Sequence, residues 1–486
     1  MNKLPTVKPF INTNVFDGLF ISSITDDSRD VQKNSLFVAR QGVESHGNEF
    51  IKDAIQNGAS CVITDQKLYE ELDIPIYYLD NLEDKILEIL FSFYNFSQND
   101  FSFHGVTGTN GKTTTAFMAH NIVRAHKKSS VYIGTLGAIV NDDPLETKGN
   151  TTPGIFEIFQ ILQTCKFQQK VFVFIEISSH ALAQKRLGDL PFSQTILLNI
   201  QSDHLDYHKT ESNYINAKLS ITELNNKNPT IILIDKIQDL IKNFSDAQKQ
   251  QLAKSLSLST TNTSAEFKYY LEYNPNGSSK IKLRFPNLCI DVQASLFLKF
   301  NVENYIAAIA LISDHIPVHE IKTIESNSIK LPQGRGEILR LREGNILIDF
   351  AHDHQSIQNI LSELANYHNE IILVFGCGGD RDRSKRSKMM KVARDFASKV
   401  FFTSDNNRYE SFSSIASDAM LGNSDTSIEI IENRQEAISH ALQCLNKKNI
   451  LVILGKGHET YMDVSGKKVP FNDKDCVLEI LGNEAN

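Results

Sequence analysis

The sequence has few cysteines, no long apolar segment and no excess of positive charge. Its six cysteines are scattered, without a CxxC pair or another metal-ligand spacing, which indicates free thiols in a cytosolic protein. The formal net charge of −8 at pH 7 argues against general affinity for nucleic acid or anionic membranes. No apolar run is long enough to cross a bilayer, and no secretory leader pattern is found. We therefore expect a cytoplasmic protein.

The length of the chain predicts several domains of the α/β class. Its 486 residues exceed what one hydrophobic core organises, so two to four domains are expected. Short strand patterns around a helical pattern at 49–57 predict a small α/β domain over residues 1–98. Apolar, β-branched strands alternate with helical patterns over 99–332, which predicts a largely parallel sheet with a hairpin-like insert at 255–300. A Pro- and Gly-containing linker at 331–336 leads into a third domain, residues 333–486.

Four predicted strands of the third domain each run into a polar motif. These strands span 346–350, 371–375, 400–403 and 450–454. The motifs that follow are Ala-His-Asp-His, Gly-Cys-Gly-Gly-Asp-Arg-Asp, Ser-Asp-Asn-Asn-Arg and Gly-Lys-Gly-His-Glu. Ligands of open α/β sheets bind beyond the carboxyl ends of the strands, so the four motifs predict one shared binding face. The cations near it, among them Arg386 and Arg408, favour an anionic small molecule that bears a carboxylate.

Residues 105–115, Gly-Val-Thr-Gly-Thr-Asn-Gly-Lys-Thr-Thr-Thr, predict a phosphate-binding loop. They lie between a short apolar stretch at 101–104 and a helical pattern at 116–123. The glycines let backbone N–H groups approach phosphate oxygens, Lys112 reaches the outer phosphates, and Thr113 offers a hydroxyl to Mg²⁺. The loop differs from the strict pattern, because Val106 stands five residues before Gly111 and the glycine is Gly105. A nucleotide is still the expected ligand.

Three further residues are candidates for the chemistry. Glu176 ends the predicted strand at 171–177, where a carboxylate near a phosphate loop suits Mg²⁺, although a solvated acid is an equal alternative. His204 lies in a segment rich in possible ligands, but a lone histidine is more often structural. Lys218 lies in a helical pattern, where a lysine is by default a solvated charge, and nothing in its spacing indicates another role.

The ordered motifs of the whole chain resemble those of the Mur ligases, the ATP-dependent amino-acid-adding enzymes of peptidoglycan synthesis. The first matches are Asp27-Ser-Arg29, Leu36-Phe-Val-Ala39, Gly108-Thr-Asn-Gly-Lys-Thr-Thr114, Asn150-Thr-Thr-Pro153 and Glu176-Ile-Ser-Ser-His180. They continue with Asp203-His-Leu-Asp-Tyr-His208, Ala217-Lys218, Phe300-Asn-Val-Glu-Asn304, Gly334-Arg335 and Asp349-Phe-Ala-His352. The last are Phe375-Gly-Cys-Gly-Gly-Asp-Arg-Asp382, Asp405-Asn-Asn-Arg408 and Gly455-Lys-Gly-His-Glu459. The resemblance implies three domains: a UDP-substrate domain, an ATP domain with a P-loop parallel sheet, and a Rossmann-like amino-acid domain.

The resemblance also implies roles for individual residues. ATP phosphates and Mg²⁺ are expected at Gly108, Thr109, Asn110, Gly111, Lys112, Thr113, Thr114, Glu176 and His204. The nucleoside end of ATP is expected at Asn301, Arg335 and Asp349. The UDP-muramoyl-peptide is expected at Ser28, Thr151, Thr152, Ser178, Gln184 and Arg186. Lys218 matches the family lysine that becomes N-carboxylated and then holds a second Mg²⁺. The resemblance therefore implies a metal ligand at this position and not a solvated charge.

The expected reaction is ATP-dependent addition of meso-diaminopimelate to UDP-N-acetylmuramoyl-L-Ala-D-Glu by a monomer. Arg408 favours this amino acid, because family members that use L-lysine lack it. The other contact positions are Arg386, Asp405, Asn406, Gly455 and Glu459.

Three positions depart from the family pattern: Asn407 replaces a proline, Asp353-His354 replaces part of Thr-Pro-Asp, and Leu298 replaces a glycine. Three alternatives remain. The chain could be a paralogue that joins L-lysine or another amino acid to a related carboxylate, a relative of folylpolyglutamate synthetase or a similar amide ligase, or a weakly catalytic binding protein.

Overall fold

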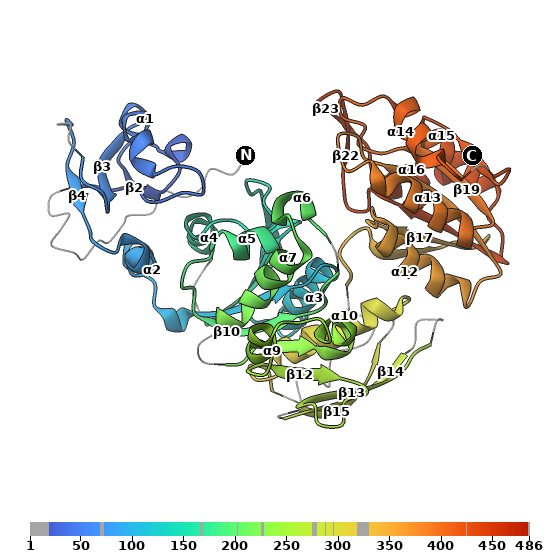
Figure 1. The fold of residues 1–486 in the computed structure, drawn as a ribbon, viewed down its shortest axis with the longest axis horizontal. Helices are drawn as coiled ribbons and strands as arrows, with labels where there is room; N and C mark the ends of the chain where they lie inside the picture. Colours follow the sequence, from blue (N-terminus) through green and yellow to red (C-terminus); the bar gives the residue numbers. More distant parts are fainter. Residues whose placement is uncertain are drawn as a thin grey trace. The chain divides into compact units, whose positions relative to one another are not determined.

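The computed structural model describes residues 19–484 except 69–71, 166–168, 202, 225–227, 275–278, 287, 295, 318–329 and 424. Contacts divide the chain into two compact units. The first comprises Met1–Tyr269, Leu283–Ile290 and Ala307–Ile324, and the second comprises Tyr270–Lys282, Asp291–Ile306 and Glu325–Asn486. Each unit is described by itself (Figure 1).

The N-terminal part of the first unit is a small parallel sheet. Its strands lie in chain order: β1 (Ser23–Thr25), β2 (Ser35–Ala39), β3 (Ala59–Thr64) and β4 (Ile76–Tyr78). Helix α1 (Ile51–Gln56) packs on it, and its Ile51 and Ala54 join a small core with Phe37 and Val62. The predicted strands at 35–39 and 59–64 are confirmed, whereas the three-residue outer strands were not predicted.

The largest sheet has eleven strands in the order β15-β14-β13-β12-β11-β10-β5-β9-β6-β7-β8. The central strands β5 (Phe101–Thr107), β9 (Val171–Glu176), β10 (Phe192–Leu197) and β6 (Ser130–Gly134) are parallel, as predicted. Strands β11 (Ile231–Leu233), β12 (Leu256–Ser259) and β13 (Phe267–Glu272) continue the parallel part. The other strands are β7 (Gly137–Val140), β8 (Asp143–Leu145), β14 (Ser279–Phe285) and β15 (Leu288–Ala294).

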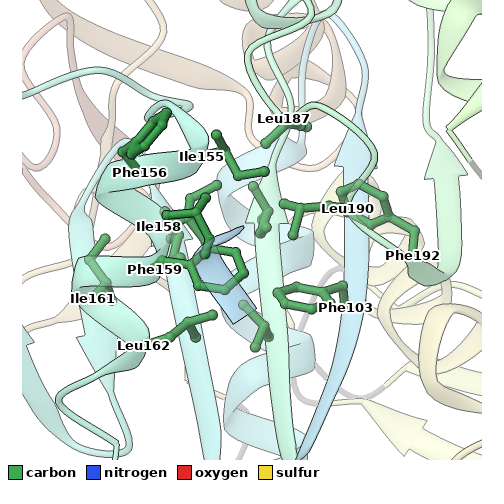
Figure 2. Packing of buried hydrophobic residues seen from close by; sticks show 14 of the residues in the cluster. Phe103, Ile155, Phe156, Ile158, Phe159, Ile161, Leu162, Leu187, Leu190 and Phe192 are labelled. Atoms are coloured by element: carbon green, nitrogen blue, oxygen red, sulfur yellow. The ribbon is translucent and has the colours of Figure 1, made fainter. Parts of the chain in front are cut away.

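Helix α4 (Ile155–Leu162) anchors the core of this sheet. Six of its eight residues are apolar, and all six are buried. They pack with Phe103 and Phe192 of the sheet and with Leu187 and Leu190 (Figure 2). Full burial of one such side chain stabilises the fold by roughly 1.5–3 kcal/mol. This core fixes the strands whose carboxyl ends carry the phosphate loop and Glu176.

The second unit contains a six-stranded sheet in the order β16-β17-β21-β18-β19-β20. Strands β17 (Asn345–Asp349), β21 (Asn449–Leu454), β18 (Glu370–Cys377), β19 (Lys399–Ser404) and β20 (Ile428–Ile430) are parallel. Edge strand β16 (Arg335–Arg340) is antiparallel to β17 and begins inside the predicted linker. A separate hairpin pairs β22 (Tyr461–Val464) with β23 (Lys467–Pro470).

Alternate side chains of this sheet enter two cores. Leu373 and Phe375 pack with helices α12 (His354–Ala365), α13 (Ser384–Phe396) and α14 (Phe412–Met420). Ile372 and Val374 pack with α15 (Arg434–Gln443) and α16 (Asp473–Glu484). Since neighbouring residues of a strand point to opposite faces, the sheet is covered by helices on both sides.

Candidate active site

The phosphate loop joins β5 to helix α3 (Lys112–Ala125). Gly111 is the residue before the helix and has a φ of 87°, a conformation that glycine adopts without strain. The helix starts four residues earlier than the predicted pattern at 116–123, so its N-terminus opens directly onto the loop. This is the geometry that helix N-termini use to bind phosphate.

The loop is held in place by the neighbouring strand end. Asn110 N–H donates to Asn199 Oδ1 (2.9 Å), and Asn110 Nδ2 donates to Gln201 Oε1 (2.8 Å). Thr109 Oγ1 lies 2.8 Å from the Tyr214 hydroxyl. Lys112 Nζ donates to the carbonyls of Gly108 and Thr109, each at 2.9 Å, so its ammonium lies over the loop.

Glu176 is fully buried at the end of β9 and accepts four hydrogen bonds. The Thr113 hydroxyl donates to Oε2 (2.8 Å), and Thr135 donates through N–H to Oε1 (2.9 Å) and through its hydroxyl to Oε2 (3.1 Å). The fourth donor is the Tyr132 hydroxyl. A Cβ at Gly134 would collide with the Glu176 carboxylate, so glycine is required there. Glu176 is therefore a positioned carboxylate, not the solvated acid of the alternative reading.

Residues expected to hold the muramoyl-peptide form one connected chain. Thr152 Oγ1 donates to the Glu176 carbonyl (2.8 Å) and accepts from Ser178 N–H (2.9 Å). Arg186 donates to the Thr152 carbonyl (3.0 Å) and to Gln184 Oε1 (2.7 Å). Thr151 lies beside them, with its hydroxyl 3.4 Å from that of Thr135. The structure thus brings the predicted substrate arm and Glu176 together.

Lys218 lies on helix α7 (Glu211–Leu219) and is 2% exposed. Its Nζ donates to the Gly108 carbonyl (2.8 Å) and to Thr107 Oγ1 (3.2 Å), which places it behind the phosphate loop. Burial lowers its pKa well below the ordinary value, and the Lys112 cation lowers it further, while Asp203 acts in the opposite direction. Burial and the Lys112 cation thus both disfavour the charged form of the Lys218 amine.

His204 is the most exposed of the predicted catalytic residues. It has a φ of 51°, its side chain is 50% exposed, and its Nε2 lies 3.4 Å from Asp203 Oδ2. Its ring contacts the His180 ring at a centroid distance of 5.0 Å.

Ser28 lies in a short 3₁₀ helix (Ser28–Asp30), whose Asp30 pairs with Lys148, three residues before Thr151. Its neighbour Asp27 has a pKa lowered to about 2, chiefly by the hydrogen bond from Arg29.

The second unit carries the residues expected at the nucleoside end of ATP. Asn301 lies on helix α10 (Lys299–Ile312), is fully buried, and donates to the Arg335 carbonyl (3.5 Å). The Arg335 guanidinium lies 4.4 Å from the centre of the Phe350 ring. Asp349 ends β17, and burial raises its pKa, which Arg335 partly offsets.

The predicted amino-acid site lies at the ends of β19 and β21. The Asn406 side chain donates to Glu459 Oε2 (2.8 Å), and Gly455, with a φ of 112°, lies against Asp405 Oδ2. Arg408 also has a positive φ, 50°, and its Nη1 donates to the Gly379 carbonyl (2.7 Å).

Arg386 and Asn407 lie beside this site with their side chains buried. Arg386 forms a two-pronged pair with Glu410 (2.8 and 2.6 Å) and also pairs with Asp418 (2.8 Å). Asn407 donates to Ser404 Oγ (3.1 Å). Arg386 therefore supports the loop through Glu410, which is a different contact from the one the sequence predicts.

Several residues of these sites were missed by the sequence reasoning. Tyr132 and Thr135 hold Glu176, and neither belongs to a motif that carries the resemblance. Arg434 is fully buried, pairs with Asp473, and donates to the carbonyls of Ser404 (3.3 Å) and Leu454 (2.8 Å). Lys456 had a usable signal, since it is a lysine between two glycines at a strand end.

Within the described residues, no group of three or more His, Cys, Asp or Glu side chains could hold a metal ion by itself. The same residues include no helix that is long and apolar enough to cross a membrane. All six cysteines are free thiols, as expected.

Three family models match the chain in order. Residues 20–82 match the Mur ligase family catalytic domain, 106–312 the Mur ligase middle domain, and 334–457 the Mur ligase glutamate ligase domain. A UDP-N-acetylmuramoyl-L-alanyl-D-glutamate–2,6-diaminopimelate ligase of Oceanobacillus iheyensis is 31% identical over 99% of both chains. The ligase of the same name from Fusobacterium nucleatum is 32% identical over 95% of this chain and 96% of its own.

Solved structures of two such ligases have the same fold. One, also titled a UDP-N-acetylmuramoyl-L-alanyl-D-glutamate–2,6-diaminopimelate ligase, is 27% identical with a TM-score of 0.66 and 96% coverage of both chains. The MurF ligase of Thermotoga maritima in complex with ADP is 17% identical with a TM-score of 0.61, and 97% of this chain and 99% of that one are covered.

Proposed function

The chain belongs to the Mur ligase family, and on that premise we propose that it joins meso-diaminopimelate to UDP-N-acetylmuramoyl-L-Ala-D-Glu. The chain is an ATP-dependent amide ligase that adds an amino acid to a UDP-N-acetylmuramoyl peptide in cell-wall synthesis, with the family's three-domain α/β architecture. The amino acid and the peptide are the proposed part.

Arg408 is the observation that carries the choice of amino acid. Meso-diaminopimelate has a second carboxylate at its far end, and a guanidinium grips a carboxylate through paired hydrogen bonds. Arg408 follows Asp405 and Asn406 on a loop next to Glu459, so one small region offers both a cation and carboxylates. The far end of meso-diaminopimelate carries one carboxylate and one ammonium, which is complementary to that set. The diaminopimelate ligases among the relatives support the same choice.

The first chemical step that we propose makes the peptide carboxylate reactive. A carboxylate oxygen attacks the γ-phosphorus of ATP, the bond to ADP breaks, and an acyl phosphate forms. A free carboxylate resists an amine because oxide would have to leave, whereas phosphate leaves readily. Lys112, whose ammonium lies over the loop, offsets the charge that develops on the transferred phosphoryl group.

The amine of the incoming amino acid then attacks the acyl carbon. The bond from carbon to the phosphate oxygen breaks, inorganic phosphate leaves, and the ammonium proton is lost to solvent. Thr152, Ser178, Gln184 and Arg186 hold the peptide in this proposal, since they form one hydrogen-bonded chain that ends at Glu176. Holding the reactants in line is the main catalytic contribution of such a site.

The described residues fit a bound Mg²⁺. Thr113 Oγ1 and Glu176 Oε2, 2.8 Å apart beside the phosphate loop, are oxygen donors of the kind that Mg²⁺ prefers. A site with few protein ligands is expected, because Mg²⁺ completes its shell with substrate phosphates and water. We assign Thr113, Glu176 and His204 to this ion, which would neutralise charge on the phosphates when bound.

Lys218 suits the carboxylation that the family resemblance implies. Its uncharged amine can add to the carbon of CO₂ and lose a proton, which gives an anionic carbamate. That anion could hold a second Mg²⁺, and its negative charge would lie near the Lys112 cation, whose repulsion lowers the pKa of Lys218. The proposed role of Lys218 rests on this conversion of an amine into an anion.

Residues 1–98, 99–332 and 333–486 are our proposed UDP-substrate, ATP and amino-acid domains. We further propose a cytoplasmic monomer. The nucleoside end of ATP is assigned to Asn301, Arg335 and Asp349.

Phosphate release by the purified chain tests the proposed function. The assay contains ATP, Mg²⁺ and UDP-N-acetylmuramoyl-L-Ala-D-Glu, with meso-diaminopimelate, L-lysine or L-ornithine as the third substrate. We expect release that depends on all components and kcat/KM that is highest with meso-diaminopimelate. A clear preference for L-lysine would overturn the assignment of Arg408 and favour the paralogue reading. Arg408→Leu serves as the matched variant and should lose the preference.

The Asn407 substitution is tested in the same assay. Asn407 is 8% exposed and its side chain donates to Ser404 Oγ, so we propose that it shapes the loop without binding the substrate. Asn407→Pro should therefore keep the order of preference among the three amino acids. A changed order would show that residue 407 sets selectivity.

A further inference from the structure

Lys456 is a buried cation that takes part in no step of the proposed reaction. It lies between Gly455 and Gly457, both in the left-handed region with φ values of 112° and 51°. Its side chain is 0% exposed. Burying a charge is costly unless it is paired and hydrogen-bonded, so the partners of Lys456 indicate what it does.

Its partners are all residues of the predicted amino-acid site. Lys456 Nζ donates to Glu459 Oε2 (2.7 Å) and to Asn406 Oδ1 (3.2 Å), and it lies 4.0 Å from Asp405 Oδ1. One ammonium group therefore touches or faces three of the positions expected to bind the incoming amino acid.

Asn406 completes the arrangement. Its Nδ2 donates to the same Glu459 oxygen (2.8 Å), and its Oδ1 accepts from both Lys456 and the Asp463 N–H (2.8 Å). These contacts orient the amide, which bonds to both Lys456 and Glu459. Glu459 Oε2 is thus fixed by two donors, while no described hydrogen bond in the structure involves Glu459 Oε1.

The charges of this group decide what it can bind. Asp405 and Glu459 supply two negative charges, and Lys456 supplies one positive charge, so the group carries one net negative charge. That charge is complementary to a single ammonium. Without Lys456, the two carboxylates would repel each other, and Glu459 would lose the donor that holds its orientation.

We propose that Lys456 is a positioning residue that holds Glu459 and Asn406 for the ammonium group of the incoming amino acid. This inference rests on the proposed function and adds a specificity determinant to it. Lys456 acts through Glu459 and does not itself bind the substrate, since its donors are turned toward the protein.

Steady-state kinetics of Lys456→Met in the full-length chain test the proposal. Loss of hydrogen bonds to a charged group should raise KM for the amino acid about tenfold or more. KM for ATP and for the UDP-substrate should stay within about twofold of wild type, because Lys456 contacts neither expected site. Lys456→Gln keeps a donor without the charge and should raise KM less than Met does.

The double variant Lys456→Met/Glu459→Gln separates positioning from a general structural role. If Lys456 acts through Glu459, its replacement should cost little more once the Glu459 carboxylate is gone. Lys399→Met is the matched control, because Lys399 pairs with Glu429 (2.9 Å) at the opposite end of β19 and should leave all three KM values unchanged.

Three results distinguish the possible failures. Unchanged KM for the amino acid in an active Lys456→Met variant, or an equal rise of KM for all three substrates, would overturn the role of Lys456. If Met does not give folded protein, Lys456→Gln decides alone by the same criterion. Absence of any amino-acid-dependent phosphate release by wild type would instead overturn the proposed function.

Discussion

At the scale of single residues, the candidate site of the first unit contains one carboxylate and one amine that are both buried. Glu176 is fully buried with four donors around it, and Lys218 is buried with its pKa lowered by burial and by Lys112. Each of these buried groups is held by hydrogen bonds to residues of other helices, strands or loops. Changes at those neighbours are therefore informative about the chemistry.

Lys218→Ala should abolish ligation, with kcat reduced at least about 100-fold, because the anionic carbamate can no longer form. Short carboxylates added to the assay should restore part of the activity, since they can supply the missing anion. The measurement is phosphate release with and without acetate or formate. Lys249→Ala, on the exposed side of helix α9 (Asp246–Leu252), is the control and should behave as wild type. Full activity of the Lys218 variant would refute the carbamate.

Gly134→Ala should displace the Glu176 carboxylate, because the new methyl group would overlap it and the Tyr132 hydroxyl. Overpacking of this kind costs about 1–3 kcal/mol of stability. We expect kcat/KM for ATP to fall at least about tenfold while far-UV circular dichroism is preserved. Gly482→Ala adds the same methyl group where no atom lies within 4 Å and should change neither quantity. Equal activity of both variants would show that the Glu176 position is not critical.

At the scale of elements, buried Arg434 ties together the strands that carry the amino-acid site. It donates to the last carbonyls of β19 and β21, Ser404 and Leu454, and pairs with Asp473 at the start of α16. Both strands continue directly into Asp405 and Gly455. One side chain from helix α15 thus sets the spacing of two loops.

Arg434→Met should destabilise the second unit by about 3–5 kcal/mol, because Asp473 would remain buried without its partner. The free energy of unfolding in urea is the measurement. In Arg434→Met/Asp473→Leu the orphaned charge is removed as well, and much of the stability should return. A double variant no more stable than the single one would locate the loss in the strand-end carbonyls and not in the unpaired carboxylate.

The elements that the sequence predicted well are those whose own residues form a clear pattern. Buried parallel strands contain continuous apolar runs such as 171–175 and 371–375, and the phosphate loop carries its own glycines. Strands β20 and β22 were missed, because short edge strands bury too few side chains to produce a periodic pattern.

The contacts of the candidate site were harder to predict than its residues. The pairing of Arg386 with Glu410 joins positions 24 residues apart, and that of Arg434 with Asp473 joins positions 39 residues apart. Such pairs depend on how helices pack across the sheet, which no local motif specifies. The sequence predicts Arg386 as an amino-acid contact, and it could not predict that Glu410 and Asp418 hold its guanidinium.

At the scale of the whole molecule, both units follow one plan. Each has a mainly parallel sheet, and its chemistry-bearing residues lie where the strands end: Glu176 is the last residue of β9, Asp349 is the last residue of β17, and Asp405 follows β19. The first unit also buries His104 and His120, and the second unit has the half-buried His458 after β21. His104 on β5 lies 5.0 Å from the His315 ring and stacks on Phe174. These histidines should govern the stability of the whole chain in acid.

The pKa of His104 is lowered well below its ordinary value, first by burial and then by His315, and burial lowers that of His120 to about 4 and that of His458 to about 3. All three are neutral when folded but bind protons at about pH 6.5 when unfolded. Since the unfolded chain binds more protons, stability should be complete above pH 6.5 and fall as pH drops toward 4 and below.

Urea midpoints measured from pH 8 to pH 4 should show this loss. His120 alone should lower the free energy of unfolding by about 3 kcal/mol once the pH is below its folded pKa, from a pKa change of about 2.5. His104→Phe keeps an aromatic ring between Phe172 and Phe174 and should flatten the decline below pH 6.5, whereas replacement of exposed His440 by Asn should not. An identical pH dependence in the His104 variant and wild type would show that the acid sensitivity does not arise at His104.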